Sequence, residues 1–169
     1  HGSSSKYADV YGFDVLELDS FHPDRYIEAI NLAEQAGYEI LIIDSLSHAW
    51  AGKDGALEAV DTAAKKMRTE NKFAAWREVT PLHNRMVDRI VGSKLHIIAT
   101  MRSKVEYIQT KDEKGHTVIQ RVGIQPIQRD GMEYEFDVVG DMDITNTLTI
   151  TKTRCPALLH QVYAKPDHN

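Results

Sequence analysis

The sequence predicts an α/β fold built on a mostly parallel central sheet. Two short, mostly apolar runs at residues 40–43 and 95–100 carry this prediction, together with the polar side chains at their ends, Asp44 and Thr100. Aliphatic runs this short are typical of strands that are buried on both faces of a parallel sheet. The stretches around them have the apolar spacing of helices, so the chain alternates between strand and helix.

The first part of the chain predicts a strand, a helix and a second strand. Residues 13–18 alternate in polarity, as a strand does. Residues 20–23 begin a helix because proline is tolerated at the first helical position, and Gly37 ends it. The apolar stripe of this helix consists of Tyr26, Ile27, Ile30 and Ala33. A right-handed crossover is the default connection between such strands.

The middle of the chain is predicted to be a loop followed by helices. The loop covers residues 45–55, and the helix after it has an apolar face made of Leu57, Val60, Ala64 and Met67. Residues 71–80 are also expected to be helical. Thr80 and Pro81 then begin a new helix or kink the existing one, because threonine caps helices and proline favours their first turn. The apolar face of this last part consists of Leu82, Met86 and Ile90.

After residue 104 the pattern changes from α/β to β. Residues 105–122 predict an inserted β-hairpin with a charged tip that contains Gly115. Residues 123–131 are expected to form a loop or a short helix. Three strands follow, a buried one, a more exposed one and an edge strand, at residues 136–139, 146–152 and 158–163. No linker divides the chain, so we expect a single domain over residues 1–169.

Composition limits the class of protein. Of the 169 residues, 42% are hydrophobic and 27% are charged, which is ordinary for a globular domain. The net charge of −5 argues against a generally basic nucleic-acid-binding surface but allows a local basic loop. No apolar stretch approaches the roughly 18–20 residues that a membrane helix needs. The single cysteine, Cys155, excludes an internal disulfide framework and fits a cytoplasmic protein.

Asp44, which directly follows the first apolar run, is the candidate functional residue there. Ligands of open α/β sheets bind at the carboxyl ends of strands, and a carboxylate there suits Mg²⁺, as in a Walker B strand. The ordinary alternative is an aspartate that caps a loop. A metal-dependent hydrolase site joining His48 and His83 to Asp44 is a further alternative, which no HExxH or paired Cys/His spacing supports. We expect His96 to be a hydrogen-bonded core residue.

Five segments occur in an order that resembles a known family: residues 42–45 with the Trp-containing loop after them, 71–76, 98–104, 128–137 and 152–154. Together they resemble the RecA-like AAA-type nucleotide-binding proteins of bacteriophages and prophages, which are linked to single-strand annealing and recombination. The resemblance spans almost the whole chain. It implies a RecA-like P-loop NTPase of the ASCE class, a three-layer sandwich that uses ATP and Mg²⁺ in the bacterial cytoplasm. It also implies homo-oligomers and phage recombination proteins as candidate partners.

The resemblance assigns roles to the matched positions. Asp44 would hold Mg²⁺ through water, and Ser45 would support that shell. Thr100 takes the place of the polar residue that senses the γ-phosphate or the attacking water, and its plain alternative is a strand cap. Lys152 and Arg154 resemble a Lys-x-Arg finger that stabilises charge on the nucleotide of the neighbouring subunit. Their alternative is a pair of exposed charges on an edge strand.

The phosphate-binding loop is the feature of the family that this sequence does not contain. In the family, a Gly-rich loop and a strand ending in Glu come before a segment like residues 1–5. No GxxxxGK[ST] occurs in the 169 residues. We therefore expect a fragment that begins just past those elements, with a tag remnant as the alternative. Without the loop, this fragment should be inactive and bind ATP weakly or not at all.

Single-stranded DNA is the expected nucleic-acid partner. In RecA-like folds the loops that leave the central strands at this point face the DNA. Lysine and arginine suit phosphates, and Tyr107 suits base stacking. The candidate contacts are Arg102, Lys104, Lys111, Lys114, Arg121 and Arg129. A solvated hairpin is the simpler alternative. For the protein as a whole, the alternative is a non-catalytic single-stranded-DNA-binding or scaffold module with the same fold.

Overall fold

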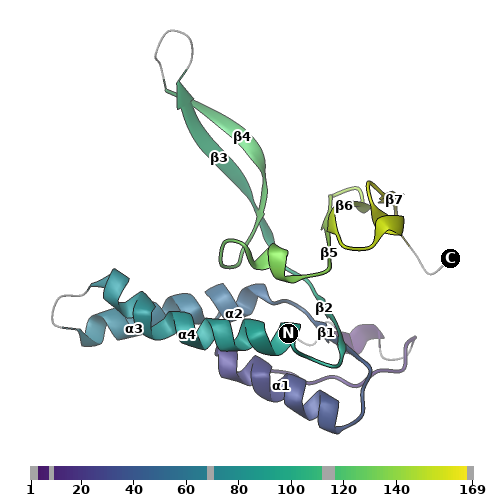
Figure 1. Cartoon of the computed structure of the whole chain (residues 1–169), viewed down its shortest axis with the longest axis horizontal. Coiled ribbons are helices and arrows are strands. Elements are labelled where there is room, and N and C mark those ends of the chain that lie inside the picture. The colour runs from purple at the N-terminus through teal and green to yellow at the C-terminus, as the bar shows by residue number, and fades with distance from the viewer. Residues whose placement is uncertain (1–3, 8–9, 68–70, 112–116, 167–169) are drawn as a thin grey trace. The chain divides into compact units, whose positions relative to one another are not determined.

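The computed structural model describes residues 4–7, 10–67, 71–111 and 117–166, with side chains outside residues 4–5 and 106–124. The protein is of mixed α/β class, as predicted, and it has helices and small sheets (Figure 1). The chain divides into two compact units, His1–Gln128 and Arg129–Asn169. A short 3-10 helix, η1 (Ser4–Tyr7), begins the first unit. The single-domain interpretation stays a prediction.

The predicted parallel strands exist, but they form a smaller and more exposed sheet than expected. Strand β1 (Ile40–Ile43) pairs in parallel with β2 (His96–Ala99), and Ile43 lies opposite Ala99. Ile43 is buried, whereas Ile40 and Ile42 are 57% and 64% exposed. The prediction of burial on both faces was therefore wrong, because successive side chains point to opposite faces and only one face is covered by described residues. His96 is also exposed, so its assignment to the core was wrong.

Helix α1 (Pro23–Gln35) matches its prediction. Proline occupies its first turn, Tyr26 and Ile30 are buried, and Gly37 follows with a positive φ of 80° that suits glycine. The strand predicted at residues 13–18 is absent from the described secondary structure, so that prediction was wrong. A strand requires a ladder partner, and this segment instead contributes Asp14, which accepts a hydrogen bond from the Tyr38 hydroxyl.

The described residues between β1 and β2 form three helices: α2 (Ser47–Ala51), α3 (Ala56–Lys66) and α4 (Lys72–Val91). Helix α2 lies inside the predicted loop, so the chain returns to helix sooner than expected. Helix α4 continues through Pro81 without a restart. Its N-cap is Asn71, whose Oδ1 accepts from the backbone N–H groups of Phe73 and Ala74 at 3.0 and 3.3 Å.

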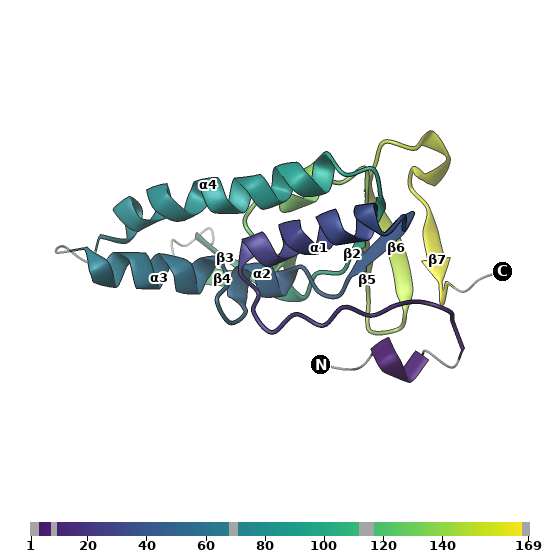
Figure 2. The same cartoon turned by 90° about the horizontal axis from the view of Figure 1, so that it is seen from below.

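Helices α3 and α4 lie side by side and form an apolar cluster (Figure 2). Small residues allow the two helices to approach closely, and the rings of Trp50 and Trp76 stack at 5.4 Å beside them. The buried members of this cluster are Ala56, Val60, Ala64, Ala75 and Val79.

Helix α1 packs against α4, and a polar cluster fastens the end of α1. Arg89 of α4 donates from Nη2 to Glu34 Oε2 at 2.7 Å and from Nε to Asn31 Oδ1 at 2.7 Å. Ser93 Oγ and the Lys94 N–H donate to Glu34 Oε1 at 2.8 and 2.9 Å. The loop after α4 is therefore tied to α1 just before β2 begins.

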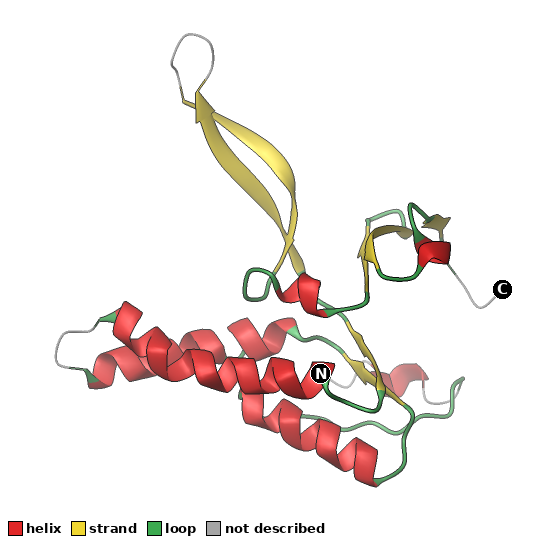
Figure 3. Ribbon diagram, viewed as in Figure 1, coloured by secondary structure: helices red, strands yellow, loops and turns green. Residues whose placement is uncertain are grey.

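The predicted hairpin forms from β3 (Ser103–Lys111) and β4 (Thr117–Pro126), with a bulge between Glu106 and Tyr107. The second unit is an antiparallel sheet of β5 (Val138–Met142), β6 (Thr147–Thr153) and β7 (Val162–Ala164) (Figure 3). Two 3-10 helices accompany it, η2 (Met132–Glu135) and η3 (Pro156–Leu158). Strand β5 was predicted to be buried, but Val138 is 40% exposed, because this small sheet has no second described layer over that face.

Glu34→Gln should destabilise the protein in a pH-dependent way. Hydrogen bonds from Arg89, Lys94 and Ser93 lower the pKa of the Glu34 carboxyl to about 2 from its ordinary value of 4.5. The stabilisation is therefore complete above the ordinary pKa and is lost as the pH falls toward 2. In urea denaturation, the difference between wild type and variant should shrink from about pH 6 to about pH 3. Glu28→Gln is the exposed control, and a difference that does not change with pH would contradict the assignment.

Candidate functional site

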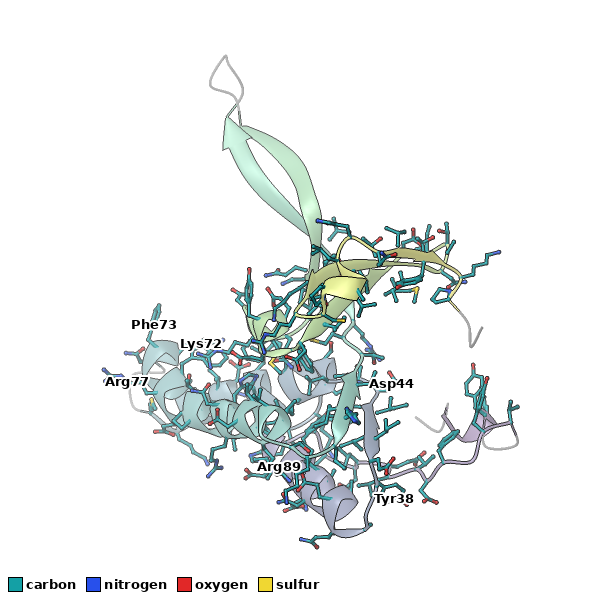
Figure 4. The ribbon with its side chains drawn as sticks, turned by 45° about the vertical axis from the view of Figure 1, so that its right-hand side comes forward. Tyr38, Asp44, Lys72, Phe73, Arg77 and Arg89 are labelled. Atoms are coloured by element: carbon teal, nitrogen blue, oxygen red, sulfur yellow. The ribbon has the colours of Figure 1, made fainter. Side chains whose placement is uncertain are left out.

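The site is built at the edge where β1 and β2 end. Because the strands are parallel and in register, the residues after Ile43 and Ala99 emerge side by side. The Thr100 N–H donates to Ile43 O at 3.0 Å, and Thr100 Oγ1 donates to Asp44 Oδ1 at 2.7 Å. Asp44 and Thr100 are both exposed, and Figure 4 shows Asp44 at the end of its strand. The structure thus brings two of the predicted site residues together.

Ser45 lies behind this edge rather than on it. Its side chain is buried, and its hydroxyl contacts His48 Nδ1 at 3.2 Å across the first turn of α2. The His48 ring stacks on Phe21 with ring centroids 4.7 Å apart. Ser45 therefore supports the backbone that carries Asp44, and its expected role in the magnesium shell stays a prediction.

The segment after Asp44 is tied to the base of the hairpin by hydrogen bonds. The Leu46 N–H donates to Thr100 O at 2.9 Å, and the Arg102 N–H donates to Ser47 Oγ at 2.9 Å. Gln128 Nε2 donates to Leu46 O at 3.0 Å from just beyond β4. The residues that enter and leave the hairpin are thereby fixed to the loop that orients Asp44.

Gln128 also pairs with His83 in the interior. Gln128 Oε1 and His83 Nε2 are 3.0 Å apart, both side chains are buried, and the edge of Trp50 packs on the His83 ring. The sequence analysis did not find this pair as a structural unit. The two residues are 45 positions apart, one in α4 and the other in the loop after β4, so no local periodicity links them. The one available signal was a histidine on the apolar face of α4.

The residues at this edge fit a magnesium ion. Mg²⁺ prefers oxygen ligands and commonly uses one or two carboxylates and retains several waters. Asp44 supplies such a carboxylate, and Thr100 uses only its Oδ1, so Oδ2 can face a hydrated cation. Within the described residues, no group of three or more His, Cys, Asp or Glu side chains forms a metal cluster. An ion here would therefore share its remaining ligands with water and substrate oxygens.

Lys152 and Arg154 belong to the second unit and are engaged there. The Lys152 ammonium donates to the backbone carbonyls of Glu133, Tyr134 and Phe136 at 3.3, 2.6 and 2.5 Å, which closes the end of η2. Arg154 Nη1 donates to Asp137 Oδ1 at 2.7 Å in an exposed ion pair. Their predicted role toward a neighbouring nucleotide stays a prediction.

The predicted nucleic-acid contacts are distributed over both units. Arg102 and Lys104 are exposed where the chain enters the hairpin, and Arg129 is half-buried at the start of the second unit. Lys114 and the side chains of Lys111 and Arg121 lie outside the described residues. The DNA-binding assignment therefore stays a prediction.

In open α/β sheets, ligands bind at the carboxyl ends of the strands, where this structure places the Asp44 carboxylate and the Thr100 hydroxyl. A family model described as an AAA domain matches residues 5–163, which include most of both units. The chain belongs to this family of AAA-type nucleotide-binding proteins. No curated protein and no solved structure matches the chain. Among the described helices, none combines the length and apolar character required to cross a membrane.

Gln128→Leu and His83→Leu should each lower the free energy of unfolding by about 1–3 kcal/mol, because each removes the buried hydrogen bond between Gln128 Oε1 and His83 Nε2. The double variant should lose less than the sum of the two single losses. Urea denaturation of the wild type, the two single variants and the double variant measures the coupling free energy between the two side chains. Gln35→Leu, at the exposed end of α1, is the matched control. Strict additivity would show that the two side chains do not stabilise each other.

Proposed function

We propose that this protein is a RecA-like ATPase of phage type that uses Mg²⁺ and ATP in single-strand annealing or recombination of DNA. The observation that carries the proposal is the hydrogen bond between Thr100 and Asp44 at the edge of the β1–β2 pair. Membership of the AAA domain family supports the ATPase class. The recombination role rests on the resemblance of the sequence to the phage proteins.

In this proposal, each residue of the edge has a separate task. Asp44 would hold the water molecules around Mg²⁺, and Thr100, whose hydroxyl donates to that carboxylate, would sense the γ-phosphate or the attacking water. Bound Mg²⁺ would neutralise phosphate charge, which lowers the barrier to phosphoryl transfer. Ser45 and His48 keep the Asp44 backbone in place from behind.

A nucleotide also requires backbone N–H groups and a lysine around its phosphates. The 169 residues contain no GxxxxGK[ST], so they supply only the acidic part of the site. We expect no thermal shift when ATP and Mg²⁺ are added to these 169 residues. A clear Mg²⁺-dependent stabilisation by ATP would contradict the proposal that these residues supply only the acidic part of the nucleotide site.

Arg154 is the better candidate of the two cations for a role in trans. Its ion pair with Asp137 is exposed, and such pairs contribute little to stability, so a nucleotide on another subunit can replace Asp137. Lys152 is more firmly held by three carbonyls. Its contribution would be to fix the end of β6, which Arg154 directly follows.

The coding sequence upstream of His1 tests the proposal directly. The ATPase function requires an upstream GxxxxGK[ST] followed by a strand that ends in Glu. The alternative function, a non-catalytic single-stranded-DNA-binding or scaffold module, requires neither. An in-frame stop codon with no such motif upstream would favour the alternative.

In the protein encoded by the complete open reading frame, Asp44→Asn should reduce the rate of ATP hydrolysis about 100-fold or more, because it removes the charge that orients Mg²⁺. Thr100→Val should reduce it about 10-fold through loss of the hydrogen bond to Asp44. Steady-state phosphate release with single-stranded DNA present is the measurement. Asp88→Asn, an exposed carboxylate on α4, is the control. Wild-type hydrolysis by the Asp44 variant would refute the site.

Arg102 and Lys104 give the DNA-binding alternative its own test. If they contact phosphates, Arg102→Ala and Lys104→Ala should each reduce the slope of log affinity against log salt by about 0.7 for single strands. Fluorescence anisotropy with an oligothymidylate at several salt concentrations measures this slope. Lys53→Ala is the control, since it removes a cation from the loop between α2 and α3. Unchanged slopes would show that Arg102 and Lys104, at the base of the hairpin, do not contact DNA phosphates.

A further inference from the structure

Arg102 is a cation that follows the candidate site closely in the chain. It lies two residues after Thr100, between β2 and β3. Two residues of extended chain span at most about 7 Å, so the Arg102 backbone lies in the same small area as Thr100 and Asp44. The sequence analysis assigned Arg102 to a DNA contact, and its place in the structure suits a different role as well.

The exposure of side chains alternates along residues 95–102. The odd-numbered residues are buried or half-buried, and the even-numbered residues are exposed. The exposed residues are His96, Ile98, Thr100 and Arg102. Alternate side chains of an extended chain point to the same face. The Arg102 side chain is therefore on the face that carries the Thr100 hydroxyl and its partner, the Asp44 carboxylate.

The backbone hydrogen bonds continue the same pattern beyond the end of β2. The Thr100 N–H donates to Ile43 O at 3.0 Å, and the Arg102 N–H donates to Ser47 Oγ at 2.9 Å. Alternate N–H groups of a strand bond to the same neighbouring strand, and both of these acceptors belong to β1 or the segment after it. Arg102 thus continues the line of β2 instead of turning away from the acidic edge.

The backbone of Arg102 is fixed, whereas its guanidinium is available. Its N–H is bound by Ser47, and its carbonyl oxygen accepts from the Ile127 N–H at 2.7 Å. Within the part of the chain that the structure describes, the Arg102 side chain is exposed and forms no ion pair. Arg154, by contrast, is paired with Asp137. A cation on a fixed backbone can bind an anionic ligand without first giving up a carboxylate.

We propose that Arg102 is a catalytic residue that contacts the γ-phosphoryl oxygens of the ATP bound at Asp44 of the same chain. This inference rests on the proposed ATPase function. Asp44 is anionic and Thr100 is neutral, so neither offsets the negative charge of those oxygens. A guanidinium does, and its planar N–H groups match the oxygens of a phosphoryl group in pairs.

The role of Arg102 in hydrolysis is electrostatic. A water oxygen bonds to the γ-phosphorus, and the bond from that phosphorus to the bridging oxygen breaks with its electron pair passing to ADP. The protons of the water leave with the phosphate product and with solvent. Arg102 keeps its own protons and stabilises the charge on the transferring group. Because this contact is strongest in the transition state, it should act on kcat more than on KM.

Steady-state phosphate release by the protein encoded by the complete open reading frame tests this role. Arg102→Ala should lower kcat about 100-fold or more and change the KM for ATP less than about threefold. Arg102→Lys should restore only part of kcat, because it keeps the charge but loses the paired N–H groups. Lys94→Ala removes an exposed cation at the other end of the same strand, and it should hydrolyse ATP like wild type. Circular dichroism verifies that the variants fold.

Calorimetry gives a readout that does not require turnover. Aluminium fluoride bound beside ADP and Mg²⁺ imitates the transferring phosphoryl group, so wild type should bind ADP more tightly when it is present. Arg102→Ala should bind ADP alone like wild type and should lose this increase in affinity. An unchanged increase would show that Arg102 does not contact the phosphoryl group.

A mixture of variants tests whether Arg102 acts within its own chain. In an equimolar mixture of Arg102→Ala and Asp44→Asn, no chain has both side chains, so hydrolysis should stay at the level of the separate variants. Hydrolysis restored by mixing would overturn the assignment to the same chain. The slope of log affinity for single-stranded DNA against log salt should be the same for Arg102→Ala and wild type. A lower slope with a wild-type kcat would make Arg102 a DNA contact instead.

The two levels of the argument fail in different ways. A wild-type kcat for Arg102→Ala, with Asp44→Asn inactive, would overturn this inference and leave the proposed function in place. Wild-type hydrolysis by Asp44→Asn would refute the site itself and this inference with it.

Discussion

The parallel register of β1 and β2 is the constraint on which the candidate site depends. A hydrogen bond between Thr100 and Asp44 requires that both strands end at the same level, and the pairing of Ile43 with Ala99 produces that level. A slip by one residue would turn every side chain of one strand to the opposite face. The exposed Ile40 and Ile42 show that burial alone does not fix this register. The backbone hydrogen bonds of Thr100 with Ile43 and Leu46 fix the register at the carboxyl ends of the two strands.

The same ties connect the site to the hairpin. Ser47, Leu46 and Gln128 join the loop after Asp44 to the two ends of the β3–β4 ribbon, and His83 anchors Gln128 in the interior. Buried polar groups are costly when unpaired, so this arrangement tolerates few alternatives. A ligand that moved the hairpin would have to displace the segment that orients Asp44. These hydrogen bonds would therefore transmit a movement of the hairpin to Asp44.

The elements that the sequence predicted well are those with strong local signals. Helix α1 has its proline, apolar stripe and terminal glycine, and the hairpin has alternating strands around a charged tip. The failures concern burial and pairing. Residues 13–18 have strand periodicity but no described ladder partner, and Pro81 lies inside one continuous helix because packing of α4 outweighs the lost hydrogen bond. Periodicity cannot reveal which face of a strand is covered.

By itself, the sequence determined the two strands and the carboxylate and hydroxyl at their ends. These follow from residue type and spacing, which act over a few positions of the chain. Only the tertiary structure decided that Thr100 bonds to Asp44, that Gln128 meets His83, and that Lys152 closes η2. Such contacts join residues separated by 16 to 56 positions. They form because packing brings distant groups together and leaves each buried polar atom in need of a partner.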